Sequence, residues 1–137
     1  MDPKGGTELQ FDELKKRLPE HYWEKINITT SVPEKTPIQK GRLNILWIKN
    51  SYDQPNVKPW FEKPENHIKY DWYIFNSHWT FEKYRLYFNV PTSRCRVIKN
   101  ALPTRQWLQK AIYKKDQPLR LIHCSTPWRG LNVLLTA

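Results

Sequence analysis

A pair of glycines, Gly5-Gly6, stands directly before Thr7, where a segment with helical periodicity begins. Glycine lets a ligand approach the backbone closely, and a helix N-terminus offers free backbone N–H groups and a partial positive charge. Thr7 and Gln10 have the spacing of a capping box, which predicts Thr7 as the helix cap. The pattern admits a phosphate site at Gly5, Gly6 and Thr7. Taken by itself, however, it is more typical of a flexible start followed by an ordinary capped helix.

Two polar residues, Lys49 and Asn50, follow the apolar run LNILWI at 43–48. A nearly continuous apolar run of this length predicts a strand in the centre of a parallel sheet. Ligands of parallel sheets bind beyond the carboxyl ends of the strands, so Lys49 and Asn50 are candidates for chemistry or ligand contact. The alternative is a solvated loop with an Asx-turn at Asn50.

A strand, a helix and a second strand are predicted at 72–76, 79–88 and 95–98. Asn76-Ser77 supplies helix N-caps, and Pro91 ends the helix because proline cannot continue its hydrogen-bond ladder. A right-handed crossover then makes the two strands parallel neighbours, with a cleft beyond their carboxyl ends. The rim positions predicted in this way are Asn76, Ser77, Lys99 and Asn100.

The other expected elements are strands at 26–30 and 119–124, a short helical turn at 57–61 and a helix at 104–115. Together they predict an α/β fold, a Rossmann-like parallel sheet with flanking helices. Seven Trp and seven Tyr exceed what a core of this size usually hides. We therefore expect some of these rings to line a cleft or a partner surface. In the helix at 79–88, one face carries Trp79, Lys83, Leu86 and Tyr87.

The chain is strongly basic, with a net charge of +10, which favours anionic partners: phosphates, nucleic acid or the surface of an anionic membrane. The basic residues are dispersed from Lys15 to Arg129, which disfavours a nucleic-acid footprint. No segment approaches the roughly 20 apolar residues of a membrane span, and the start has no signal-peptide core, so we predict a cytoplasmic protein. Cys95 and Cys124 lack the spacing of metal ligands and are expected to be reduced core residues, with no metal site.

Three stretches, taken in order, resemble a GT-B glycosyltransferase of the retaining family 4-like group. The segment GGTE at 5–8 resembles the family's N-terminal glycine turn. The segments YDW at 70–72 and VIKNA at 97–101 resemble the end of the N-terminal Rossmann-like domain, and STPWRGL at 125–131 resembles the first strand-helix turn of the donor domain. A glycine turn of this kind normally follows a strand, so the first strand of the domain is expected to be lacking.

The resemblance implies transfer of a sugar from a nucleotide-diphosphate donor to an acceptor hydroxyl, with no metal and no further cofactor. The implied donor diphosphate-binding residues are Gly5, Gly6, Thr7, Arg129 and Gly130. The acceptor, a glycan, a lipid or a small molecule, stays open, and so do the catalytic residues: Lys49, beside Asn50, stands where many relatives have a histidine. His123 occupies the place of a second basic residue of the family.

The implied domains are an incomplete N-terminal acceptor-side domain at 1–103 and, at 104–137, a linker helix with a truncated start of the donor domain. The family's paired glutamates would lie beyond residue 137. Two other hypotheses remain open. One is a non-enzymatic Rossmann-like module whose aromatic and basic side chains hold single-stranded nucleic acid. The other is a remnant domain with no activity of its own.

Overall fold

The computed structural model describes residues 5–100. The chain divides into two compact units, residues 1–102 and 103–137, and the described residues all belong to the first. The helix expected at 104–115, the strand expected at 119–124 and the segment with Arg129 and Gly130 lie outside the described residues. The domain assignment therefore stays a prediction.

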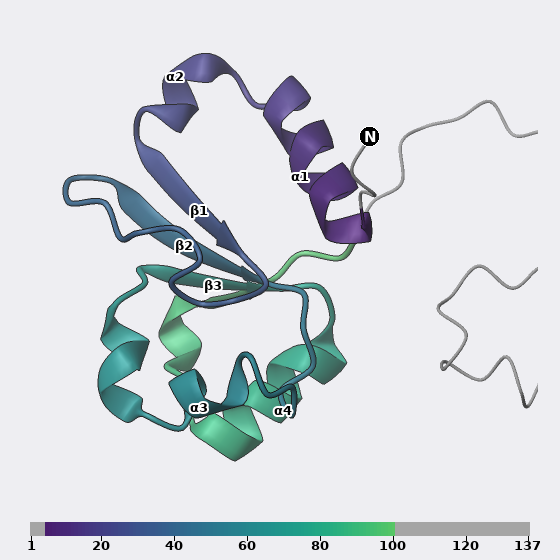
Figure 1. The fold of residues 1–137 in the computed structure, drawn as a ribbon, viewed down its shortest axis with the longest axis vertical. Helices are drawn as coiled ribbons and strands as arrows, with labels where there is room; N and C mark the ends of the chain where they lie inside the picture. Colours follow the sequence, from purple (N-terminus) through teal and green to yellow (C-terminus); the bar gives the residue numbers. More distant parts are fainter. Residues whose placement is uncertain (1–4, 101–137) are drawn as a thin grey trace, which may run out of the picture. The chain divides into compact units, whose positions relative to one another are not determined.

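Four parallel strands form one sheet in the order β1-β2-β3-β4 (Figure 1). Their bounds are β1 Ile26–Thr30, β2 Leu43–Ile48, β3 Trp72–Phe75 and β4 Cys95–Val97. The α/β prediction with a parallel Rossmann-like sheet is confirmed. β2 pairs with strands on both sides, as expected for the most apolar run, and β3 and β4 each end one residue before their predicted ends. All carboxyl ends therefore lie at one edge, which we call the carboxyl edge.

Helices lie on both faces of the sheet (Figure 1). α1 (Gly6–Arg17) and α2 (Glu20–Trp23) lie on one face, and α3 (Lys58–Phe61) and α4 (His78–Phe88) lie on the other. The short 3-10 helices η1 (Pro64–Ile68) and η2 (Thr92–Arg94) lead into β3 and β4. This arrangement follows from right-handed crossovers, which bring α3 and α4 to the same face.

The capping box predicted for α1 is wrong. The residue that caps α1 is Gly5, in an extended conformation (φ −79°, ψ 174°), and no side chain accepts a hydrogen bond there. Because α1 begins at Gly6, Thr7 already lies inside the first turn, where its helical backbone prevents it from acting as the cap. The glycine pair is thus part of the helix start itself.

The core lies between the sheet and α3, η1 and α4, and it is largely aromatic. Phe61 of α3 lies 4.7 Å from the ring of Tyr84 and 5.6 Å from that of Phe88, both from α4. The buried side chains are Leu46, Ile48, Val57, Phe61, Tyr70, Tyr73, Phe75, Tyr84, Val90 and Cys95. Cys95 is a free buried thiol whose pKa is raised to about 11 by burial, in agreement with the predicted reduced core residue.

The face of the sheet turned toward α1 is covered less well, since α1 contributes no buried residue. The side of α4 that faces away from the sheet is exposed to solvent as well. α4 buries Thr80 and Tyr84, whereas Trp79, Leu86 and Tyr87 are 59%, 66% and 60% exposed. The face that carries these large apolar residues in the sequence is therefore the outer face of α4 within the described part of the chain.

Candidate functional site

Three segments that are distant in sequence meet at the carboxyl edge around Lys49. Lys49 directly follows β2, and its Nζ donates hydrogen bonds to Oδ1 of Asn100, at 2.9 Å, and to Oε1 of Gln10. Gln10 lies on α1, one turn after Gly6 and on the same face of the helix. Asn100 lies three residues beyond β4. The first two turns of α1 are thereby tied to the ends of β2 and β4.

The ammonium group of Lys49 is half-buried and has neutral hydrogen-bond partners. Its Nζ lies 3.7 Å from the centroid of the Trp47 ring, a cation–π contact. Burial lowers the pKa of Lys49 to about 8. Among residues 5–100, no carboxylate forms an ion pair with its ammonium group. The two amide oxygens of Gln10 and Asn100 are uncharged. A partly desolvated cation without a counter-ion is suited to receive an anionic ligand.

Glu8 folds back over the N-terminus of α1. A Cβ atom at Gly5 would lie 2.8 Å from Oε2 of Glu8, so this carboxylate rests against the Gly5 backbone, where the helix dipole favours negative charge. At Gly6 an added Cβ would meet nothing within 4 Å. A phosphate that approaches this turn meets the exposed carboxylate of Glu8.

The predicted rim residues divide into two groups. Ser77 Oγ accepts a hydrogen bond from the Thr80 backbone N–H at 3.1 Å, and Asn76 Oδ1 accepts one from Thr80 Oγ1 at 3.0 Å. These two side chains hold the start of α4. Asn100 contacts Lys49, and Lys99 is exposed. Asn50 is tied in through its backbone carbonyl, which accepts a hydrogen bond from the Tyr84 hydroxyl at 3.3 Å.

The structure thus brings Lys49 and Asn100 together and adds Gln10, which the sequence analysis had used only as part of the capping box. The signal for Gln10 was its position one helical turn after Gly6, which places it on the face that also carries the glycine. Arg129 and Gly130 lie outside the described residues.

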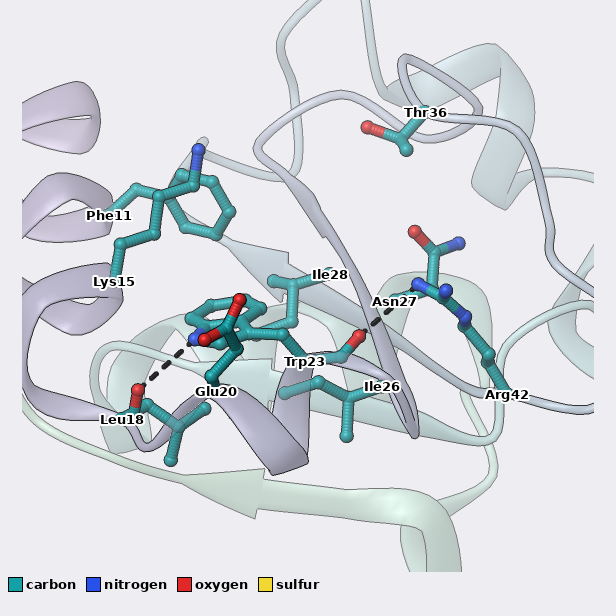
Figure 2. A pocket seen from close by; sticks show the side chains of 10 residues that line it. All are labelled: Phe11, Lys15, Leu18, Glu20, Trp23, Ile26, Asn27, Ile28, Thr36 and Arg42. Atoms are coloured by element: carbon teal, nitrogen blue, oxygen red, sulfur yellow. Dashed lines mark hydrogen bonds between the residues drawn. The ribbon is translucent and has the colours of Figure 1, made fainter.

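A pocket of about 680 Å³ lies elsewhere, between α1, α2, β1 and the connection from β1 to β2 (Figure 2). Two of its polar groups are engaged: Arg42 Nη1 donates to the Trp23 carbonyl at 3.2 Å, and Trp23 Nε1 donates to the Leu18 carbonyl at 3.3 Å. It contains none of the predicted site residues and lies where α1 stands off the sheet. Its lining is formed by Phe11, Lys15, Leu18, Glu20, Trp23, Ile26, Asn27, Ile28, Thr36 and Arg42.

An aromatic cluster lies on the outer face of α4. The ring of Tyr52, from the loop after β2, stacks on Tyr87 at 4.3 Å and meets Trp79 edge-on at 6.5 Å. Lys83 Nζ lies between 5.6 and 5.9 Å from the centroids of all three rings. Trp79 and Tyr87 are exposed, while their predicted role in lining a cleft or a partner surface stays a prediction.

Comparison with protein-family models, with curated proteins and with solved structures finds no match. None of the helices described between residues 5 and 100 has the length and apolar character needed to span a bilayer. In the same part of the chain, no group of three or more His, Cys, Asp or Glu side chains is arranged to hold a metal ion.

Proposed function

We propose that this chain is a glycosyltransferase of the GT-B type, or a part of one, that transfers a sugar from a nucleotide-diphosphate donor to an acceptor hydroxyl. The observation that carries the proposal is the meeting of the glycine-initiated α1 with Lys49 and Asn100 at the carboxyl edge. A parallel α/β sheet binds its ligands at this edge, and a helix start together with an unneutralised ammonium group favours an anion there.

In such a transfer, negative charge builds up on the departing diphosphate as the bond to the sugar breaks. Groups that are already oriented toward this charge lower the barrier, because they need not reorganise during the reaction. The backbone N–H groups at the start of α1 would serve this purpose. Arg129, by resemblance, would add a guanidinium group suited to bidentate contact with phosphate.

Calorimetric titration with a panel of nucleotide-diphosphate sugars tests the proposal. We expect at least one donor to bind, and we expect Arg129→Ala to weaken that donor by about tenfold or more, since a charge-assisted phosphate contact is lost. Arg17→Ala removes an equal charge from an exposed position at the end of α1 and should leave the affinity unchanged. If no member of the panel binds, the proposal is wrong.

The aromatic cluster on α4 favours a second candidate, a module that binds single-stranded nucleic acid. Exposed rings beside a lysine form a surface on which bases can stack, and each stacked base contributes about 1–3 kcal/mol. For this candidate, oligonucleotides should bind with strong salt dependence, and Trp79→Ala should weaken them. Nucleotide-diphosphate sugars should then have no effect. The two candidates therefore give opposite results with the same two ligand classes.

A further inference from the structure

We propose that Lys49 is the cation that contacts the donor diphosphate at the carboxyl edge, and that the site takes up a proton when the diphosphate binds. This inference rests on the proposed function and adds to it the binding group and its dependence on pH. It concerns a residue at which the resemblance gives no role, because many relatives have a histidine there.

Lys49 is placed where its amine can reach a ligand at the start of α1. Its ammonium group lies at the end of the central strand β2, in contact with a side chain of α1 and with the segment after β4. The N-terminal turn of α1 begins with Gly6, one turn before the contact at Gln10. A phosphate that reaches this helix start is therefore held close to the amine.

The hydrogen-bond partners of the Lys49 amine are uncharged. Three other lysines of residues 5–100 form ion pairs with carboxylates: Lys16 with Glu13 at 2.9 Å, Lys58 with Glu62 at 3.6 Å and Lys69 with Glu34 at 2.6 Å. Lys49 has two amide oxygens in place of a carboxylate. An amide oxygen accepts a hydrogen bond without cancelling the charge, so the favourable partner for this ammonium is an anion brought by the ligand.

The charged side chains of the segments that contact Lys49, on α1 and after β4, do not neutralise its ammonium group. On α1, Glu8 rests against the Gly5 backbone, and in the segment after β4, Lys99 is exposed. Neither contributes to the shift in the pKa of Lys49, which is lowered to about 8 by burial alone. The bound diphosphate restores the pKa toward its ordinary value, because an adjacent negative charge favours the protonated amine.

The affinity for the diphosphate should fall as the pH rises, because the pKa of Lys49 is lower in the free protein than in the complex. Below about pH 8 the free amine is already protonated, and binding needs no proton. Above it the free amine is mostly neutral, so binding takes up a proton from solvent, and affinity falls as the pH rises. Between about pH 7 and about pH 9 the loss should approach tenfold, since the charged fraction of a group with this pKa falls by that factor.

Calorimetric titration of the whole chain with a nucleotide-diphosphate sugar over this pH range tests the inference. We expect the wild type to lose affinity toward high pH and, in buffers of different ionisation enthalpy, to take up about half a proton near pH 8. Lys49→Arg keeps its charge at all these pH values and should bind with a flat profile. Lys49→Gln should bind about tenfold more weakly at neutral pH, also with a flat profile.

Lys40→Gln removes the same charge from an exposed loop position and should retain the wild-type profile. The inference is overturned if the wild type binds equally well across the range, or if Lys49→Gln binds as tightly as wild type. Absence of binding in the wild type at neutral pH would instead refute the proposed function. The circular dichroism spectrum of each variant establishes that it is folded.

Discussion

At the scale of single residues, the amine of Lys49 at the end of β2 differs from the other charged groups of the described surface. Surface ion pairs in this chain, such as Arg85 with Glu82 at 2.7 Å, join exposed side chains and contribute little to stability. Lys49 differs because its charge is partly desolvated and is held by neutral oxygens and an indole ring. Keeping an unneutralised charge there costs folding free energy, which makes sense where a ligand supplies the opposite charge.

A second residue-scale feature is the buried amide of Asn44, which organises the connection from β1 to β2. Its Oδ1 accepts hydrogen bonds from Asn27 Nδ2 at 2.8 Å and from the Gln39 backbone N–H at 3.0 Å. Its Nδ2 donates to the carbonyls of Gln39 and Arg42, both at 3.0 Å. Four hydrogen bonds thus converge on one side chain that is 6% exposed.

We predict that Asn44→Ala lowers the free energy of unfolding by about 2–4 kcal/mol, because several buried polar groups lose their partner at once. Asn44→Asp should also destabilise the fold, since it removes the Nδ2 donor. Urea denaturation measures both effects. Asn56→Ala, at an exposed position, is the matched control and should change stability little. If the urea midpoint of Asn44→Ala equals that of the wild type, the hydrogen bonds of Asn44 do not stabilise the fold to this extent.

At the scale of elements, the start of α4 explains why the hydroxyl of Ser77, a predicted rim residue, already has a hydrogen-bond partner within the fold. Ser77 caps the N-terminus of the helix, and Asn89, in the left-handed conformation (φ 52°), caps its C-terminus. Side chains of the Ser77 type satisfy an N–H group that the helix cannot pair internally. The hydroxyl predicted to face a ligand is therefore already bonded within the fold.

Replacing Ser77 with alanine should lower the free energy of unfolding by about 1 kcal/mol, the usual loss for a helix cap. Ser77→Asp should keep most of the stability because a carboxylate can also cap the helix. Thermal or urea denaturation gives these values, and calorimetry gives the affinity for a donor. The affinity for the donor should be unchanged in both variants. A large loss of affinity without loss of stability would assign Ser77 to the ligand site.

The sequence was most informative where one pattern admitted one structure. The runs at 26–30 and 43–48 were predicted with the bounds that the structure has, because β-branched and apolar residues between polar or glycine-containing turns leave little choice. The cap of α1 was placed two residues too late, at Thr7 instead of Gly5, since glycine can act as a cap without a side-chain hydrogen bond. The outward direction of Trp79 and Tyr87 followed from the packing of Tyr84, which helical spacing alone does not reveal.

The candidate site could be predicted only in part, because some of its contacts depend on how distant segments pack together. The carboxyl edge followed from the parallel order of the strands, and with it the place of Lys49 and Asn100. The contact between Gln10 and Lys49 joins residues 39 positions apart. Its formation depends on how α1 lies against the sheet, and no local pattern encodes that placement.

At the scale of the whole molecule, charge and fold point to the same kind of ligand. A net charge of +10 raises the local concentration of anions and speeds their encounter with the protein, an effect that salt weakens. The field alone does not select one site among the lysines. The proposed site is distinguished from the other lysines by the contact of Lys49 with α1 at the carboxyl edge of the sheet.

Mapping a bound nucleotide-diphosphate sugar by two-dimensional ¹H–¹⁵N NMR tests this central claim most directly. We predict that backbone signals shift at residues 5–10, 49–50 and 99–100, and that Lys49→Gln needs about ten times more ligand to reach the same shifts. We predict no change on the outer face of α4. Shifts confined to that face, or to the pocket beside Trp23, would contradict the account.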